Sequence, residues 1–221
     1  MSGYLGSKAA SGMYQKIIAM MPPHKTYIES HLGGGAVMRN KPPSEQSIGI
    51  DLYAKALSEF ECDYNVQMLN VCAHKFLRNY QFIGDEVVYA DPPYVGDTRT
   101  SNAKYEHEYT DADHIELITI LKSLPCPVIL SGYPSKLYDE LLIGWNSVEQ
   151  QAMTRGGVRT EKIWFNYDID KSHWVSYAGK DFTDRQRIKR KAERFKSKYK
   201  NLPKHERLAV LAAIMEVEAE A

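Results

Sequence analysis

Apolar residues recur along the chain in two patterns that predict alternating strands and helices. Short apolar runs bounded by glycine, proline or charged residues are typical of buried strands, and apolar residues three or four positions apart are typical of helices. The runs predict strands at 25–30, 47–51, 85–91, 127–132, 145–153 and 161–169. The helical spacing predicts helices at 13–21, 53–80, 111–124, 134–144, 184–200 and 205–221.

The order of these segments indicates the fold class. Apolar strands that alternate with helices are typical of an α/β domain around a mostly parallel central sheet with helices on both faces. We assign this domain to residues 1–180 and a basic C-terminal helical extension to residues 181–221. Binding sites of such sheets lie at the carboxyl ends of the strands. The polar residues that follow the predicted strands are therefore the first candidates for function.

The segment Asp91-Pro92-Pro93-Tyr94 ends one of these strands. The prolines fix the backbone, so the Asp91 carboxylate and the Pro92 carbonyl are two fixed acceptors that suit an amino group with two hydrogens. Tyr94 offers an exposed flat face to a planar ring. The segment predicts a site for an exocyclic amine on an aromatic heterocycle. A simple proline turn is the alternative, but the other two Pro-Pro pairs of the chain lack the acid and the aromatic residue.

Glycines and an acid follow two of the other strands. Gly33, Gly34 and Gly35 have no Cβ atom, so a ligand can lie against their backbone N–H groups at the start of the following helix. Asp51, at the end of the next strand, is well placed to accept both hydroxyls of a ribose. Together they indicate a nucleoside-containing cofactor. A triple glycine is also common in an ordinary strand-to-helix turn.

Composition narrows the class of protein. The 221 residues include 28 basic and 28 acidic side chains, so the net charge points to no partner. Cys62, Cys72 and Cys126 are few and widely spaced, and we expect reduced, mostly buried thiols of a cytosolic protein rather than metal ligands. The N-terminus has no signal-peptide pattern, and no apolar run approaches the roughly 18 residues of a membrane span.

The order of these motifs resembles that of the adenine-specific (N6) DNA methyltransferases that carry a DPPY motif, and more narrowly their short phage and prophage members. The segment YLGSK at 4–8 is similar to the family's N-terminal cofactor motif, and YIESHLGGGAV at 27–37 is similar to its glycine-rich signature. Ser30 and His31 stand where the family has Pro-Phe. Two further segments resemble the family's later strands: 128–133 and 159–167.

The resemblance implies a Rossmann-like, S-adenosylmethionine-dependent methyltransferase fold. It implies an enzyme that transfers a methyl group from S-adenosylmethionine to the N6 amino group of a flipped-out adenine in double-stranded DNA, without a metal, in the cytoplasm of a bacterial cell or a phage-infected host. The catalytic residues that it implies are Asp91, Pro92, Pro93 and Tyr94. The cofactor-binding residues that it implies are Tyr4, Lys8, Glu29, Gly33, Gly34, Gly35, Asp51 and Asp91.

Three polar segments are candidates for contact with DNA. The segment 95–110 follows the DPPY motif, and the segment 154–160 is a predicted flexible loop; both are expected at the strand ends. The helix 184–200 is strongly basic, and a narrow apolar stripe can dock it on the domain while its basic face meets phosphates. The stripe consists of Ile188, Phe195 and Tyr199. The residues that we assign to DNA binding are Arg99, Lys104, Tyr105, Tyr109, Arg155, Arg159, Arg187, Lys191 and Arg194. Ordinary solvated surface is the alternative for each segment.

Two other functions stay open at this point. The same geometry suits adenine in RNA or the amino group of cytosine, although the acid at position 91, where a serine would favour cytosine, disfavours the latter. A non-catalytic nucleic-acid-binding protein that retains the methyltransferase fold is the alternative from another class. No helical recognition region separates Asp51 from Asp91, so we expect a short or degenerate target sequence.

Overall fold

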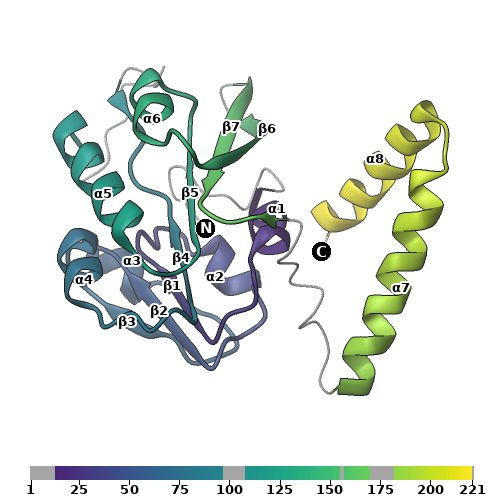
Figure 1. Ribbon diagram of the computed structural model, residues 1–221. Coiled ribbons are helices and arrows are strands. Elements are labelled where there is room, and N and C mark those ends of the chain that lie inside the picture. The colour runs from purple at the N-terminus through teal and green to yellow at the C-terminus, as the bar shows by residue number, and fades with distance from the viewer. Residues whose placement is uncertain (1–12, 97–107, 155–156, 170–181, 221) are drawn as a thin grey trace.

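A computed structural model of the 221-residue chain describes residues 13–96, 108–154, 157–169 and 182–220. One seven-stranded sheet with helices on both faces forms its main body (Figure 1). The strands are β1 Thr26–Glu29, β2 Gln46–Ile50, β3 Gln67–Leu69, β4 Glu86–Ala90, β5 Val128–Gly132, β6 Asn146–Thr154 and β7 Gly157–Phe165. The described helices are α1 Met13–Met20, α2 Ala36–Asn40, α3 Ala54–Ser58, α4 Ala73–Asn79, α5 Asp111–Ser123, α6 Lys136–Leu141, α7 Phe182–Lys200 and α8 Lys204–Glu220.

The strand order is β3-β2-β1-β4-β5-β7-β6. The first five strands in this order are parallel, and β7 lies antiparallel between β5 and β6. The order reverses between β1 and β4, which is the point at which open α/β sheets bind ligands. The predicted α/β class and mostly parallel sheet are confirmed.

Side chains that alternate along the strands build a separate apolar core on each face of the sheet. In β4, Val88 and Ala90 belong to the core under α4, α5 and α6, whereas Val87 and Tyr89 belong to the core under α1 and α2. All four are at most 1% exposed. The strand that carries Asp91 is therefore held on both faces, which gives the residue after it a rigid support.

The prediction of one continuous helix over 53–80 is wrong. Two short helices, α3 and α4, flank the strand β3, which pairs in parallel with β2. Tyr64, Val66 and Met68 pack on the core at every second position, so the apolar period in this segment is two rather than three or four. A strand that completes the edge of the sheet is more favourable here than a continuous helix.

The loop predicted over 154–160 is also wrong in its extent. β6 and β7 form an antiparallel hairpin that stays paired as far as Thr154 and Gly157. Gly132, the last residue of β5, pairs with Lys162. Since β7 begins five residues earlier (162 − 157), the end of the hairpin extends about 16 Å beyond β5 on the side of the carboxyl ends.

Two further features of the described residues concern α5 and the cysteines. Thr110 and Asp113 form a reciprocal capping box at the start of α5. Ile115 of this helix is 43% exposed, whereas His114, Leu117, Ile118 and Leu121 are buried. All three cysteines are free thiols as expected, but only Cys126 is buried; the two others, Cys62 and Cys72, are partly exposed.

The helices α7 and α8 form a hairpin beside the sheet (Figure 1). Both helices are confirmed. The expected docking of the α7 stripe on the domain is not: Phe195 is 55% exposed, and Ile188, Phe195 and Tyr199 face α8. No described helix is long and apolar enough to cross a membrane.

Candidate active site

Three acidic residues meet at the carboxyl edge of the sheet. Glu29 ends β1, and its backbone lies in register with Gly49 of β2 on one side and Tyr89 of β4 on the other. Asp51 and Asp91 come directly after these neighbouring strands. The topology therefore brings together residues that lie up to 62 positions apart in the sequence (91 − 29).

Asp51 holds the glycine loop that follows β1. Its Oδ2 accepts a hydrogen bond from the N–H of Gly33 at 2.7 Å, and its Oδ1 accepts one from the N–H of Tyr53 at 2.8 Å. Gly33 has a φ of 50°, in the left-handed region that glycine adopts without strain. The carboxylate fixes the turn that leads into α2.

Gly35 is required by the packing of the same loop. It has a φ of 61° and precedes the first residue of α2. A Cβ atom at this position would lie 2.3 Å from the ring of Phe60. Only glycine satisfies both the backbone conformation and the close approach of this ring.

The Asp91 carboxylate is oriented by a chain of hydroxyl groups. Ser131 Oγ donates to Asp91 Oδ1 at 2.8 Å, and the hydroxyl of Tyr89 lies 2.9 Å from Ser131 Oγ. Since Ser131 has a single hydroxyl hydrogen and gives it to Asp91, Tyr89 donates to Ser131. Both residues are buried, so the two hydroxyl groups hold the carboxylate in place without competition from water.

The residues after Asp91 are packed rather than exposed. Pro92 is buried, and Tyr94 is 7% exposed, so the exposed ring expected from the sequence is wrong. The ring centroid of Tyr94 lies 4.4 Å from that of Tyr133, with the two planes tilted by 56°. A stacking role for Tyr94 stays a prediction, and it now has to use the small part of the ring that its neighbours leave open.

Glu29 lies beneath the edge with a hydrogen bond from the hydroxyl of Tyr27, at 2.9 Å from Oε2. Burial, followed by the charge of Asp91, raises the pKa of Glu29 to about 8, against the lowering by the Tyr27 hydrogen bond. Lys41 is also buried, and burial lowers its pKa to about 7 despite the charge of Glu29. Burial therefore favours the protonated form of Glu29.

A second polar network connects the glycine loop to the start of α5. The hydroxyl of Tyr109 lies 2.9 Å from His31 Nε2 and 3.1 Å from His74 Nε2. His74 Nδ1 lies 3.2 Å from a carboxylate oxygen of Glu116 in α5. Ser30 Oγ lies 2.9 Å from His31 Nδ1. Ser30 and His31, which stand where the resembled family has Pro-Phe, thus both take part in hydrogen bonds.

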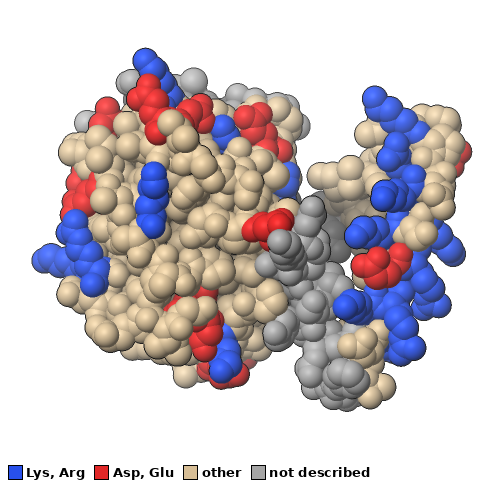
Figure 2. Space-filling model, viewed as in Figure 1, with Lys and Arg blue, Asp and Glu red and all other residues tan. Residues whose placement is uncertain are grey.

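Several predicted site residues cannot be placed at this edge. Tyr4, Lys8, Arg99, Lys104, Tyr105 and Arg155 lie outside the described residues. Arg159 belongs to β7, and the structure describes only the backbone of this residue. Arg187, Lys191 and Arg194 are exposed on α7, along which most of the basic side chains of the hairpin are spread (Figure 2).

Ser131, Tyr89 and the pair His31–His74 were not predicted from the sequence. Ser131 is a polar residue in an otherwise apolar buried strand, and this pattern could have identified it. Its contact with Asp91 depends on the pairing of β4 with β5, which no local pattern reveals.

One known protein family matches part of the chain. Residues 55–155, which contain the Asp91–Tyr94 segment, match the family described as D12 class N6 adenine-specific DNA methyltransferase. No curated protein matches the chain. The narrower resemblance to phage and prophage members stays a prediction.

Solved structures with similar folds include an rRNA methylase from Streptococcus thermophilus. It is 13% identical, with 69% of this chain and 93% of that chain covered and a TM-score of 0.46. A dimethyladenosine transferase from Plasmodium falciparum is 17% identical, with 70% and 60% covered and a TM-score of 0.45. The strand order itself, with β7 antiparallel between β5 and β6, is typical of the Rossmann-like fold of class I S-adenosylmethionine-dependent methyltransferases.

Proposed function

The chain belongs to the D12 class of N6 adenine-specific DNA methyltransferases, which methylate N6 of adenine in DNA with S-adenosylmethionine, and we propose that it acts on an adenine flipped out of double-stranded DNA. The observation that carries the proposal is the fixed carboxylate of Asp91, held by Ser131 at 2.8 Å, at the same edge as the Gly33–Asp51 pair. An acceptor for the amine and a loop for a nucleoside thus lie on adjacent strands.

The residues of the glycine loop fit S-adenosylmethionine. A carboxylate has about four lone-pair sites, and Asp51 uses two of them on backbone N–H groups, so others remain for the hydroxyls of a ribose. Gly33, Gly34, Gly35 and Asp51 would hold the nucleoside part, and Tyr4, Lys8 and Glu29 complete the proposed set. The bound cofactor supplies a methyl group on a positively charged sulfur.

The role of Asp91 follows from the chemistry of the amine. The lone pair of N6 is delocalised into the adenine ring, which makes the nitrogen a poor nucleophile. Acceptance of its two hydrogens by the Asp91 carboxylate and the Pro92 carbonyl favours a pyramidal nitrogen with an available lone pair. Ser131 and Tyr89 keep the carboxylate in one orientation, so that it does not have to reorganise during the reaction.

A duplex substrate requires two further functions. The amine of a stacked and paired adenine cannot reach the partly buried carboxylate of Asp91 at the edge of the sheet, so the base has to leave the helix and enter the site beside Asp91 and Tyr94. The duplex also needs contacts to its phosphates, for which the exposed Arg187, Lys191 and Arg194 of α7 are suited. We place this activity in the cytoplasm of a bacterial cell or a phage-infected host.

Mass spectrometry of digested DNA tests the proposed activity. The full chain, incubated with S-adenosylmethionine and duplex DNA from a methylation-free host, should produce N6-methyladenine and no methylated cytosine. RNA offered in competition should stay unmodified. Preferential methylation of RNA or cytosine would contradict the proposed substrate.

Two substitutions separate the proposed residue roles. Asp91→Ala should leave cofactor affinity within a few-fold and lower turnover by a factor of at least about 100. Asp51→Ala should chiefly weaken cofactor binding, measured by calorimetry. Asp63→Ala, an exposed acid on the β2–β3 connection, is the control and should change neither quantity. Full turnover of Asp91→Ala would refute the assignment.

A further inference from the structure

The helical hairpin α7–α8 exposes an unusual amount of apolar surface. Of the residues in these two helices whose exposure the structure describes, none is buried. The large apolar residues exposed in the hairpin are Phe195, Leu208, Leu211, Ile214, Met215 and Val217. A contiguous apolar patch of this kind in a protein of balanced charge marks a surface for association.

The apolar arc of α8 is too wide for α7 to cover. At 3.6 residues per turn, the six large apolar residues from Leu208 to Val217 occupy about 180° of the circumference of α8. Contact with one neighbouring helix covers a stripe of about 100°. The rest of the arc therefore needs a second helix beside it.

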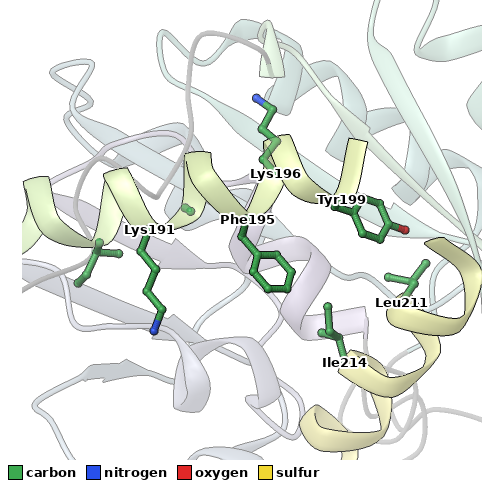
Figure 3. Close-up of a pocket in the computed structure, with 8 residues that line it drawn as sticks. Lys191, Phe195, Lys196, Tyr199, Leu211 and Ile214 are labelled. Atoms are coloured by element: carbon green, nitrogen blue, oxygen red, sulfur yellow. The ribbon is translucent and has the colours of Figure 1, made fainter. Parts of the chain in front are cut away.

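An apolar groove runs between the two helices. It has a volume of about 560 Å³, and Phe195 and Tyr199 of α7 project toward Leu211 and Ile214 of α8 (Figure 3). Lys191 also lines the groove, where its aliphatic stem can lie against apolar surface while its charge stays in water. The apolar lining of the groove suits apolar side chains of another helix.

The described part of the sheet domain has no matching surface. Its exposed large apolar residues are Leu52, Val71, Ile83, Ile115 and Ile143. Leu52 and Val71 follow the paired strands β2 and β3, and the three others lie on separate segments of the chain. The apolar surface that matches the hairpin best is that of an identical hairpin. A twofold axis would place α8 of each copy against the groove of the other.

Charge complementarity supports this arrangement. α7 has nine basic and two acidic residues, whereas α8 from Leu208 to Glu220 has three acidic and no basic residues. In an antiparallel pair of hairpins, the acidic end of one α8 would lie along the basic α7 of the partner. Like charges would face each other if the two α7 helices paired directly, which disfavours that alternative.

We propose that the hairpin α7–α8 is the interface of a symmetric dimer of this chain, in which each α8 fills the apolar groove of the other copy and the four helices form a bundle. The outward faces of the two α7 helices stay exposed in this dimer. The proposal does not depend on the methylation chemistry, so the two can fail independently.

Sedimentation equilibrium of the full chain, freed of nucleic acid, tests the proposal. We expect a species of twice the 25.2 kDa mass of the chain. The double variant Leu211→Glu, Ile214→Glu should weaken the dimer at least about 100-fold, because each copy loses two apolar contacts and introduces buried charge. The control variant Ile83→Glu, Ile143→Glu alters two residues of the sheet domain that are 78% and 77% exposed, and it should leave the dimer unchanged.

The outcomes separate the possible partners of the hairpin. A monomer at all concentrations up to about 100 μM would overturn the proposal, whether the hairpin then covers its own sheet domain or another protein. A dimer that the Leu211→Glu, Ile214→Glu variant does not weaken would overturn it as well, since the interface then lies elsewhere. If circular dichroism shows that this variant loses helix, the Leu211→Ala, Ile214→Ala variant takes its place with the same expected direction.

Discussion

The hydroxyl of Tyr109 lies 2.9 Å from Nε2 of His31. This contact joins the chain that leads into α5 to the loop that follows β1. Tyr109 was expected from the sequence to contact DNA, and the structure instead engages its hydroxyl with His31 and His74. The contact to DNA stays a prediction, and a substitution can separate the two roles.

Tyr109→Phe should lower the free energy of unfolding by about 1–2 kcal/mol, because two partly buried histidine nitrogens lose their partner. Affinity for DNA should change little if the hydroxyl is structural. Urea unfolding and a DNA-binding titration measure the two quantities on the same variant. Weakened DNA binding with unchanged stability would instead support the predicted contact.

The stability of the protein should fall in mild acid because of His31. Burial, together with the charges of His74 and His114, lowers the pKa of His31 to about 3, from 6.5. Between these values the unfolded chain binds a proton that the folded chain does not bind, so stability is lost as the pH falls through 6.5. His31 alone contributes a slope of up to about 1.4 kcal/mol per pH unit.

His31→Phe removes this titration and should flatten the acid limb of stability against pH, measured by urea unfolding between about pH 7 and pH 4. His205→Phe changes an exposed histidine on α8 and should leave the limb as it is. An unaltered limb in His31→Phe would show that other groups cause the acid sensitivity.

Ser131→Ala should act on turnover through Asp91. The carboxylate loses the donor that orients it, so we expect kcat to fall by a factor of about 10 to 100 with the KM for the cofactor unchanged. Tyr89→Phe is the matched control, since it removes the donor behind Ser131 but keeps the bond from Ser131 to Asp91. An equal loss of turnover in both variants would indicate a general structural effect.

Gly35→Ala should destabilise the protein by more than either of two other glycine substitutions. Gly35 combines a positive φ with a Cβ position 2.3 Å from Phe60. Gly144 has a φ of 88° in open space, and Gly96 has open space without a positive φ. We expect a loss of about 3 kcal/mol at Gly35, about 1 kcal/mol at Gly144 and close to none at Gly96. Equal losses at Gly35 and Gly144 in thermal unfolding would exclude a contribution from Phe60.

The basic residues of α7 lead to a prediction about the salt dependence of DNA binding. Changing Arg187, Lys191 and Arg194 together to glutamine should flatten the slope of log affinity for DNA against log salt by up to about three units, if each contacts a phosphate. Binding to target and non-target DNA should weaken equally, because phosphates carry no sequence information. A slope equal to that of the unaltered chain would show that these three residues contact no phosphate and that this face of α7 is ordinary solvated surface.

The fold could be predicted from the sequence where one pattern dominated. The apolar run before Asp91 indicated a buried strand, and the structure buries every residue of β4. β3 was missed because Tyr64, Val66 and Met68 lie between two helices and were included in a longer helical pattern. The pairing of β3 with β2 is a tertiary interaction that the spacing of a few residues does not reveal.

The candidate site was predicted where chemistry depends on residue type and strand position. Asp51 and Asp91 were found in this way, and the structure places the strands that precede them on either side of β1. The contacts that fix these acids were not found. Ser131 reaches Asp91 across the pairing of β4 with β5, and His31 reaches Tyr109 over 78 residues, so both contacts follow from the tertiary arrangement rather than from a local motif.

The overhanging hairpin of β6 and β7 has a consequence for engineering. The part of the hairpin near the sheet is paired with β5 as far as Lys162 and Gly132. Within the described residues, the rest of β6 and β7 pair with each other alone, as far as Thr154 and Gly157. Residues inserted between these two would lengthen the hairpin without disturbing the strand that carries Asp91. A DNA-recognition segment inserted at this position would give the enzyme a longer DNA target.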